Sequence, residues 1–390
     1  MDPVRNPYSP GAGRPPTALV GRDAQRGAWR VALDRVQAGR SAQPMVLYGL
    51  RGVGKTVLLT VFSREADDRE WIVAQVEAAA GKTLRATISD ALHPTLSDLA
   101  RPSAGRRFLQ ALKTAVSFRA SVDATGSWTF GLDLADSPGG GADTGSMETD
   151  LAKLVRDLSG AAGEQGVGLA ILIDEAQDLT RDELTAVCAT AHLAGQNSWP
   201  CVFALAGLPS LPRILAEAKS YAERLFSFKR VEHLGRDLAR DALLEPSIAE
   251  GVAWEDDALN LILDEAQGYP YFLQQFGQET WNETVKPPVT LADARVGAVR
   301  GRAALDDGFF RVRWDRATRS EQQYLRALAV DGYQGRSSSD VARRLGRPPT
   351  SLGPARASLI SKGLIYAPEH GVVAFTVPGM ATFIQRQSEP

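Results

Sequence analysis

The stretch that decides the fold is MVLYGLRGVGKTVLL, residues 45–59. Apolar residues lead into a turn that contains three glycines, one lysine and one threonine, and the sequence then becomes apolar again. This order predicts a buried strand, a tight turn and the first residues of a helix. Glycines leave the backbone N–H groups of the turn open to phosphate oxygens, and the N-terminus of the helix adds a favourable dipole. The stretch therefore predicts a site for the phosphates of a nucleotide.

The spacing of the glycines, the lysine and the threonine matches the P-loop pattern G-x-x-x-x-G-K-[ST] in full. Lys55 is expected to act catalytically by supplying charge to the β- and γ-phosphates, and the Thr56 hydroxyl to ligate Mg²⁺. The alternative is a glycine-rich turn with a chance lysine, which the flanking strand and helix disfavour. The predicted nucleotide contacts of the turn are Gly49, Leu50, Arg51, Gly52, Val53, Gly54, Lys55, Thr56 and Val57.

A second motif, LAILIDEAQDL at residues 169–179, is expected to complete the site. A buried strand that ends in Asp174 would place a carboxylate beside the phosphates, where it can hold the metal through water. Glu175 could then orient or deprotonate the attacking water. Two adjacent acids after a strand are often only a polar strand exit, but the P-loop upstream favours the catalytic interpretation.

Strand and helix patterns alternate along the first part of the chain. Besides the strand before the P-loop, apolar runs predict strands at residues 71–78, 167–174, 201–207 and 226–234. Helical patterns fill the intervals between them. This alternation predicts an α/β fold with a parallel five-stranded sheet covered by helices on both faces.

The domain organisation follows from changes in these patterns. Residues 1–16, with five prolines and no periodicity, are expected to be a disordered lead-in. A nucleotide-binding domain is predicted at 17–235, with a hairpin and linker inserted at 118–147. Helical patterns at 236–310 predict a lid and a bridging helix, and at 311–390 three helices and two short strands predict a winged helix.

Composition excludes several classes of protein. The chain of 390 residues is 44% hydrophobic and 23% charged, with a formal charge of -2, which excludes a uniformly basic coat for nucleic acids. Cys188 and Cys201 lie in apolar surroundings without metal-ligand spacing, and we expect reduced core thiols in a cytoplasmic protein. No apolar run approaches the ~18 residues of a membrane span.

These motifs together resemble the AAA+ ATPases, and within them the Orc/Cdc-like and STAND-related "AAA ATPase domain" group. LVGRDAQ at residues 19–25 is similar to the opening motif of that group, with Asp23 in place of the usual glutamate. The P-loop and the acidic strand follow at the separation typical of these proteins. The tripeptide Gly268–Pro270 resembles the GxP element of STAND lids. The resemblance implies an ATPase that uses ATP and Mg²⁺ and forms nucleotide-dependent homo-oligomers.

The resemblance also implies roles for residues outside the two motifs. Arg224 precedes the fifth predicted strand, where AAA+ proteins carry an arginine finger that acts on a neighbour's γ-phosphate; Arg230 is the substitute candidate. The alternative for Arg224 is a solvated arginine at a helix end. Val20 and Gly21, with Pro270 opposite, are the expected walls of an adenine site, although ordinary packing would also explain them.

The sequence departs from the AAA+ pattern in two places. At the end of the fourth predicted strand, where a polar sensor is usual, the chain has Ala206, Gly207 and Leu208, and the nearest hydroxyl belongs to Ser210. The lid has a proline where many AAA+ proteins have a sensor arginine. Hydrolysis is therefore expected to be slow or to depend on assembly or a partner.

The C-terminal segment carries a local positive charge. Residues 301–390 contain 13 Arg/Lys and 8 Asp/Glu, a balance of +5, so the other 300 residues carry -7. Such an excess of positive charge suits contact with the DNA backbone. The predicted wing tip, "EHGVV", has no Arg or Lys, and this favours a protein partner instead. The predicted functions are a DNA-binding ATPase and, as the alternative, a STAND-like switch that contacts a protein. The candidate DNA contacts are Arg343, Arg344, Arg347, Ser351 and Arg356.

Overall fold

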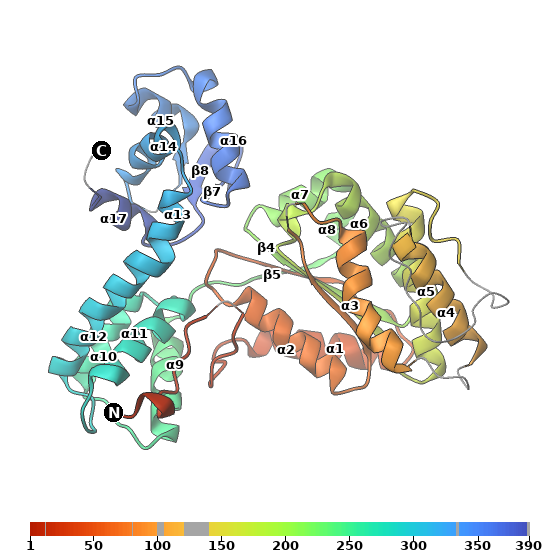
Figure 1. Cartoon of the computed structure of the whole chain (residues 1–390), viewed down its shortest axis with the longest axis horizontal. Helices are drawn as coiled ribbons and strands as arrows, with labels where there is room; N and C mark the ends of the chain where they lie inside the picture. The colour runs from red at the N-terminus through yellow and green to blue at the C-terminus, as the bar shows by residue number, and fades with distance from the viewer. Residues whose placement is uncertain (12, 80, 100–104, 121–139, 333–334, 388–390) are drawn as a thin grey trace.

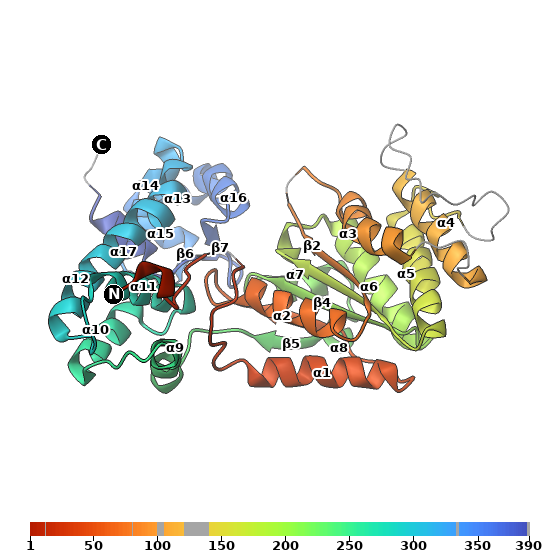
Figure 2. The same ribbon diagram turned by 60° about the horizontal axis from the view of Figure 1, so that its bottom comes forward.

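The computed structural model describes residues 1–11, 13–79, 81–99, 105–120, 140–332 and 335–387. Figures 1 and 2 show an α/β body on one side of the molecule and, on the other side, a helical lid with a C-terminal module beside it. We use these names for the body (17–235), the lid (236–283) and the C-terminal module (318–387).

The body is built on a parallel sheet, as predicted. Its strand order is β2-β3-β4-β1-β5, so β4 separates the strand before the P-loop from the strand that ends in the acidic pair. All carboxyl ends therefore meet at one edge, where parallel sheets bind ligands. The strands are β1 Met45–Tyr48, β2 Ile72–Glu77, β3 Leu169–Asp174, β4 Cys201–Gly207 and β5 Ser227–Arg230.

Helices cover both faces of the sheet, as alternating side chains along each strand require. One face packs on α1 and α2, where Trp29 stacks on Phe62 with ring centroids 4.8 Å apart. The other face packs on α3 to α7. The body helices are α1 Asp23–Gln37, α2 Lys55–Asp67, α3 Leu84–Leu99, α4 Arg106–Ala120, α5 Met147–Glu164, α6 Arg181–Gln196, α7 Leu211–Ala218 and α8 Ala222–Leu225.

A long bridging helix connects the lid to the C-terminal module (Figure 1). It changes from α-helix to π-helix at Leu305–Arg311 and returns to α-helix before it ends. The remaining helices of this region are α9 Arg236–Ala249, α10 Asp256–Ala266 and α11 Pro270–Glu283 in the lid, and α12 Leu291–Ala304 and α13 Val312–Asp315 in the bridge.

The C-terminal module contains three helices, a small antiparallel sheet of order β6-β8-β7 and a final helix. Thr318 and Glu321 form the expected capping box at its first helix. The sequence analysis missed β6 and α17, which are short. The elements are α14 Arg319–Ala329, β6 Arg336–Ser337, α15 Ser338–Arg344, α16 Gly353–Ser361, β7 Ile365–Tyr366, β8 Val372–Phe375 and α17 Met380–Gln385.

The lid and the C-terminal module share one hydrophobic core. Phe310 of the bridge contacts Phe272 of the lid and stacks on Phe383 of the module, with centroids 6.1 and 5.5 Å apart. Because close-packed cores resist internal rearrangement, we expect the lid and the module to move as one unit relative to the body.

The expectation of a disordered lead-in at residues 1–16 is wrong. The described residues of this stretch, 1–11 and 13–16, form a strap that lies along the lid (Figure 2). Tyr8 is 2% exposed, and its hydroxyl donates a hydrogen bond to Leu243 O at 2.6 Å. The indole of Trp281 donates to Asp2 O at 3.0 Å. Proline content and missing periodicity do not reveal burial against a distant segment, which is why sequence reasoning failed here.

The predicted hairpin around Trp128 lies outside the described residues. The segment that follows it is held by a buried ion pair, in which Arg85 donates to Asp150 at 2.6 Å and to two backbone carbonyls. Cys188 and Cys201 are buried and free, as expected. Among the described residues, none of the helices combines the length and the apolar character that crossing a membrane requires.

Candidate nucleotide-binding site

The P-loop turn needs its glycines for two separate reasons. Gly52 and Gly54 have φ values of 83° and 94°, in the left-handed region that favours glycine. At Gly49 a Cβ atom would lie 2.1 Å from Val231 O, which closes that position to any side chain. The turn is therefore fixed between β1 and the segment after β5.

Lys55 lies inside this turn at the N-terminus of α2, with 6% of its surface exposed. Its Nζ donates hydrogen bonds to Gly49 O at 3.0 Å and Leu50 O at 2.8 Å. Burial lowers the pKa of Lys55 to about 8, although the carboxylates of Glu175 and Asp174 oppose the shift. A phosphate at this position would favour the charged form and offset the cost of burial.

Thr56 and Asp174 meet at the carboxyl edge of the sheet. The Thr56 hydroxyl donates to Asp174 Oδ2 at 2.6 Å. Burial raises the pKa of Asp174, and the hydrogen bond from Thr56 opposes this shift. A hydroxyl and a carboxylate oxygen suit Mg²⁺, which takes few protein ligands and keeps waters and substrate phosphates. The residues present therefore fit a phosphate-bound magnesium ion.

Glu175 follows Asp174 in a left-handed conformation with φ of 48°. Its carboxylate contacts Arg51 Nη1 at 3.1 Å and accepts a hydrogen bond from Gln177 Nε2 at 2.6 Å. The other end of the Gln177 amide accepts from Leu208 N at 2.9 Å. Gln177 thus connects the acidic strand to the end of β4, where the sequence offers no polar sensor.

Sequence reasoning missed Gln177, although its position two residues after the acidic pair was a usable signal. Ser210, the hydroxyl considered instead, is buried at the start of α7, where its side chain makes no capping hydrogen bond. A Cβ at Gly207 would lie 2.5 Å from Gln177 Oε1, so a side chain here would displace this amide.

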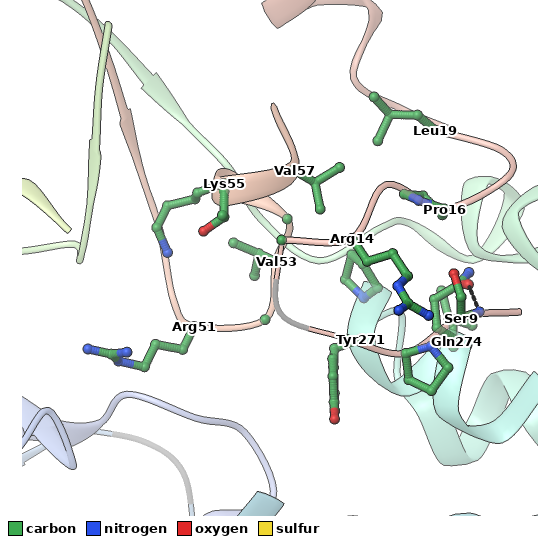
Figure 3. Close-up of a pocket in the computed structure, with 18 of the residues that line it drawn as sticks. Ser9, Arg14, Pro16, Leu19, Arg51, Val53, Lys55, Val57, Tyr271 and Gln274 are labelled. Carbon is green, nitrogen blue, oxygen red and sulfur yellow. Dashed lines mark hydrogen bonds between the residues drawn. The ribbon is translucent and has the colours of Figure 1, made fainter. Parts of the chain in front are cut away.

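The P-loop opens into a cavity of about 480 Å³ between the body, the lid and the strap (Figure 3). Five cationic and three acidic side chains line it, a net charge of +2. The cations come from four separate segments, so the excess arises only on folding. The charged residues are Arg14, Arg22, Arg51, Lys55, Arg313, Glu77, Asp174 and Glu175.

Most of the predicted contacts line this cavity, and three do not. Gly21 packs on the lid, where a Cβ would lie 2.9 Å from Leu238, and Leu50 packs into the body core. Gly49 lies beneath the turn, against Val231 O. The predicted residues that line the cavity are Val20, Arg51, Gly52, Val53, Gly54, Lys55, Thr56, Val57, Asp174, Glu175 and Pro270.

The strap and the bridge contribute lining residues that sequence reasoning missed. Arg14 and Pro16 of the strap lie beside the P-loop in Figure 3. Tyr271, Phe309 and Arg313 form a wall on the lid side. Their separation along the chain left no local signal.

Arg22 connects the opening motif to the P-loop. Arg22 is 6% exposed, and its guanidinium donates to three backbone carbonyls, those of Gly21, Val53 and Glu232. Burial lowers its pKa. The arginine therefore joins the P-loop to the segment that leads into the lid.

Arg224 and Arg230 lie at opposite edges of the sheet. Arg224 precedes β5, at the amino edge, in a surface groove with His192 and Tyr221, and it does not line the P-loop cavity. Arg230 is at the carboxyl end of β5, where it pairs with Glu232 at 3.0 Å. Arg224 therefore lies outside the P-loop cavity of its own chain.

The candidate DNA contacts differ in their surroundings. Arg344 pairs with Asp331 and donates to Ala327 O at 2.9 Å, and Arg343 pairs with Asp340. Arg356 is half-buried, whereas Arg347 is exposed. The exposed Ser351 hydroxyl donates to Pro348 O at 2.8 Å. The structure therefore does not present these five residues as one uniform surface.

Two separate segments of the chain match models of known protein families. Residues 18–203 match the model of the AAA ATPase domain, and residues 307–384 match that of a domain of unknown function (DUF8462). No curated protein matches the chain.

Solved structures resemble the whole chain. A Walker-type ATPase of Pyrococcus abyssi is 18% identical with a TM-score of 0.61, covering 95% of this chain and 98% of that one. The Orc1 protein of Aeropyrum pernix in complex with DNA is 16% identical with a TM-score of 0.48, covering 95% and 93%. At 18% identity the likeness to the Pyrococcus protein concerns the fold. The family match and the P-loop geometry together identify residues 18–203 as an AAA ATPase domain with the P-loop NTPase fold.

Proposed function

We propose that this chain binds Mg·ATP in the P-loop cavity, hydrolyses it, and uses the nucleotide state to control the C-terminal module. The observation that carries the proposal is the complete phosphate site: Lys55 buried in a glycine turn, with the paired Thr56 and Asp174 beside it. A buried cation without phosphate is costly, so the site is built for an anion.

Each residue of the site has a distinct proposed role. Lys55 and the turn amides bind phosphate oxygens, and Thr56 and Asp174 would hold the Mg²⁺, which supplies charge stabilisation when bound. Glu175 orients the attacking water and accepts its proton. Gln177 keeps the Glu175 carboxylate aimed, since it donates to it at 2.6 Å. Val20 and Pro270 are the proposed walls of the adenine site.

The first experiment tests binding and turnover separately. Calorimetry should show Mg·ADP and Mg·ATP binding for the wild type, and a loss of about 100-fold or more for Lys55→Met. Lys82→Met, at an exposed lysine, should bind as the wild type does. Glu175→Gln should keep its affinity and lose about 10²–10⁴-fold in turnover. Wild type that binds neither nucleotide would exclude the proposal.

A direct contact supports nucleotide control of the C-terminal module. The backbone N–H of Arg51, inside the P-loop, donates to Thr376 O of the module at 3.1 Å. The lid also contacts the loop, where Tyr271 N donates to Gly52 O at 3.3 Å. Because the lid and the module share one core, a change in the loop would shift both. We therefore propose a STAND-like switch in which the nucleotide exchanged at the P-loop decides whether the module stays docked.

We further propose that the module is a winged helix, from its helices and its antiparallel sheet. Hydrogen exchange tests the docking. Amides near Thr376 should exchange more slowly in one nucleotide state than in the other, with those of the control segment α4 in the body unchanged. Identical exchange in Mg·ADP and Mg·ATP would contradict the switch.

DNA binding is the second candidate function, and the exposed Arg347 within a segment of charge +5 favours it. Duplex affinity should fall with salt, and Arg347→Ala should lower the slope of log K against log salt by about 1. Glu369→Ala at the wing tip is a control that should not lower affinity. Salt-independent or absent binding with ATP present would exclude DNA as the target.

Arg224 gives the proposal a consequence for assembly. Its place at the sheet edge opposite the P-loop suits an arginine finger acting in a neighbouring subunit. Turnover per subunit should then rise with protein concentration, and Arg224→Ala should lower it by roughly 10³-fold at saturating assembly. Concentration-independent turnover would contradict this role and favour a solvated helix-end arginine.

A further inference from the structure

Arg313 of the bridging helix lines the phosphate cavity together with Lys55 and Glu175, although it lies outside the matched ATPase domain. Its guanidinium lies over the ring of Phe309, 4.0 Å from the centroid, and Nη1 donates to Phe309 O at 2.6 Å. Among the described residues, no carboxylate comes within ion-pair distance of it. Arg313 is thus a half-buried cation without a neutralising partner.

A stack of three side chains fixes Arg313 relative to the P-loop. The Phe309 ring lies on the Tyr271 ring with centroids 4.8 Å apart and an interplanar angle of 23°. Tyr271 N in turn donates to Gly52 O of the loop. Phe309 belongs to the π-helix, a rare conformation often found at functional sites, and Arg313 lies two residues beyond the end of that helix. The bridge therefore places the guanidinium at the cavity through a defined chain of contacts.

The charges around Arg313 are those of an anion site. Burial lowers the pKa of Arg313, and the nearby charge of Arg51 lowers it further. Two cations that repel each other in a cavity of net charge +2 are stabilised by a shared anion. A structural arginine looks different: Arg85 also lies over a ring, that of Phe118, but donates to the carboxylate of Asp150.

We propose that Arg313 binds the terminal phosphate of a nucleoside triphosphate and so distinguishes it from the diphosphate. Backbone amides of the turn serve the inner phosphates, and Lys55 is shared between the β- and γ-phosphates. Arg313 is within charge range of Arg51, which pairs with Glu175, the residue proposed to orient the attacking water. This places it on the side of the outermost phosphate. The assignment rests on the proposed nucleotide function.

A consequence follows from the position of Arg313 in the chain. It lies in α13, immediately before the first helix of the C-terminal module. A contact with the terminal phosphate would therefore hold the bridge against the P-loop, and its loss on hydrolysis would free the bridge. The nucleotide state would reach the module through this arginine.

The test compares the affinities for Mg·ADP and for the magnesium complex of a non-hydrolysable ATP analogue. Arg313→Gln should weaken binding of the analogue by about tenfold or more and leave that of ADP within about twofold. Arg313→Lys should recover part of the loss, since it restores the charge without the planar fork. Arg316→Gln, three residues on and exposed, is the matched control and should change neither affinity.

The outcomes separate the two proposals. Wild type that binds neither nucleotide would overturn the nucleotide function and this assignment with it. Wild type that binds both, with the ratio of the two affinities unchanged in Arg313→Gln, would overturn the Arg313 assignment alone. Equal weakening of both ligands, with a lower thermal midpoint without nucleotide, would make Arg313 a packing residue and also overturn it. Should Arg313→Gln fail to fold, the ratio for Arg313→Lys decides.

Discussion

The two basic regions of this molecule differ in how their cations are neutralised. In the P-loop cavity, the hydrogen bonds that the described residues make with Lys55 go to backbone carbonyls, and Arg313 contacts a carbonyl and an aromatic ring, while Arg51 pairs with Glu175. In the C-terminal module, cations pair with carboxylates of the same region. These pairs are Arg336 and Arg344 with Asp331, Arg343 with Asp340, and Lys362 with Glu321.

The difference teaches that an excess of basic residues does not by itself locate a phosphate site. The module has a balance of +5, yet much of that charge is satisfied internally. The cavity has only +2, but two of its cations, Arg22 and Lys55, are buried, and its charges are incompletely paired. Neutralising a cavity charge should therefore change ligand binding or turnover, whereas neutralising a paired charge in the module should change stability.

The largest effect on stability is expected at Glu321, in the module. It is 4% exposed and accepts hydrogen bonds from Lys362 Nζ and Thr318 N, both at 2.6 Å. Burial alone would raise its pKa, but the hydrogen bonds from Lys362, Ser358 and Thr318 lower it to about 2. The ionised form therefore stabilises the fold fully above pH 4.5, and this contribution disappears as the pH falls toward 2.

Glu321→Gln should cost about 2 kcal/mol at pH 7 and should remove most of the acid dependence between pH 4.5 and 2. Denaturant unfolding monitored by circular dichroism at several pH values measures both. Glu369→Gln, exposed between β7 and β8, is the control and should unfold as the wild type does. If the mutant has unchanged stability, the Glu321–Lys362 pair contributes no more to the free energy of unfolding than an exposed surface charge does.

Sequence patterns predicted the sheet and the phosphate turn because both depend on local order. The residues that form the strand and the P-loop turn are contiguous, at 45–59, so the local sequence determines their geometry. The acidic strand from Leu169 was equally local, since an apolar run ending in two carboxylates has few structural solutions.

The parts that could not be predicted are contacts between distant segments. Tyr8 anchors the strap because its hydroxyl donates to Leu243 O and its ring packs against Gly277, and both partners are far away in the sequence. Arg313 reaches the cavity because a π-helix and a stack on Tyr271 place it there. The pairing of Arg344 with Asp331 likewise depends on the folded module. No periodicity records such contacts.

A smaller effect is expected at Gln177, an uncharged residue on the cavity side of the comparison. Gln177→Leu keeps the approximate volume but removes the hydrogen bonds to Glu175 and from Leu208. Turnover should fall about tenfold, with nucleotide affinity within twofold, because only the aim of the carboxylate is lost. Gln165→Leu, an exposed glutamine at the end of α5, should leave both unchanged.

A second substitution separates positioning from packing at Gln177. Gln177→Glu retains an acceptor for Leu208 N but places a carboxylate beside Glu175, which raises the pKa of the pair. The acidic limb of the pH–rate profile should therefore move to higher pH. If the profile of Gln177→Glu does not shift and Gln177→Leu has normal turnover, Gln177 does not position the Glu175 carboxylate.

The smallest effect, and one of opposite sign, is expected for Lys55 in the absence of nucleotide. Burial holds its pKa near 8, below the ordinary 10.5, so the charged form destabilises the fold below pH 8 and this penalty fades as the pH rises to 10.5. The free energy of unfolding of Lys55→Met should therefore be about 1 kcal/mol higher than that of the wild type at pH 7, and the difference should shrink toward pH 10. With saturating Mg·ADP the order should reverse, because only the wild type gains from the ligand. A Lys55→Met protein that is less stable than wild type at pH 7 without nucleotide would mean that the carbonyls of Gly49 and Leu50 satisfy this cation, and the contrast with the paired charges of the module would fail.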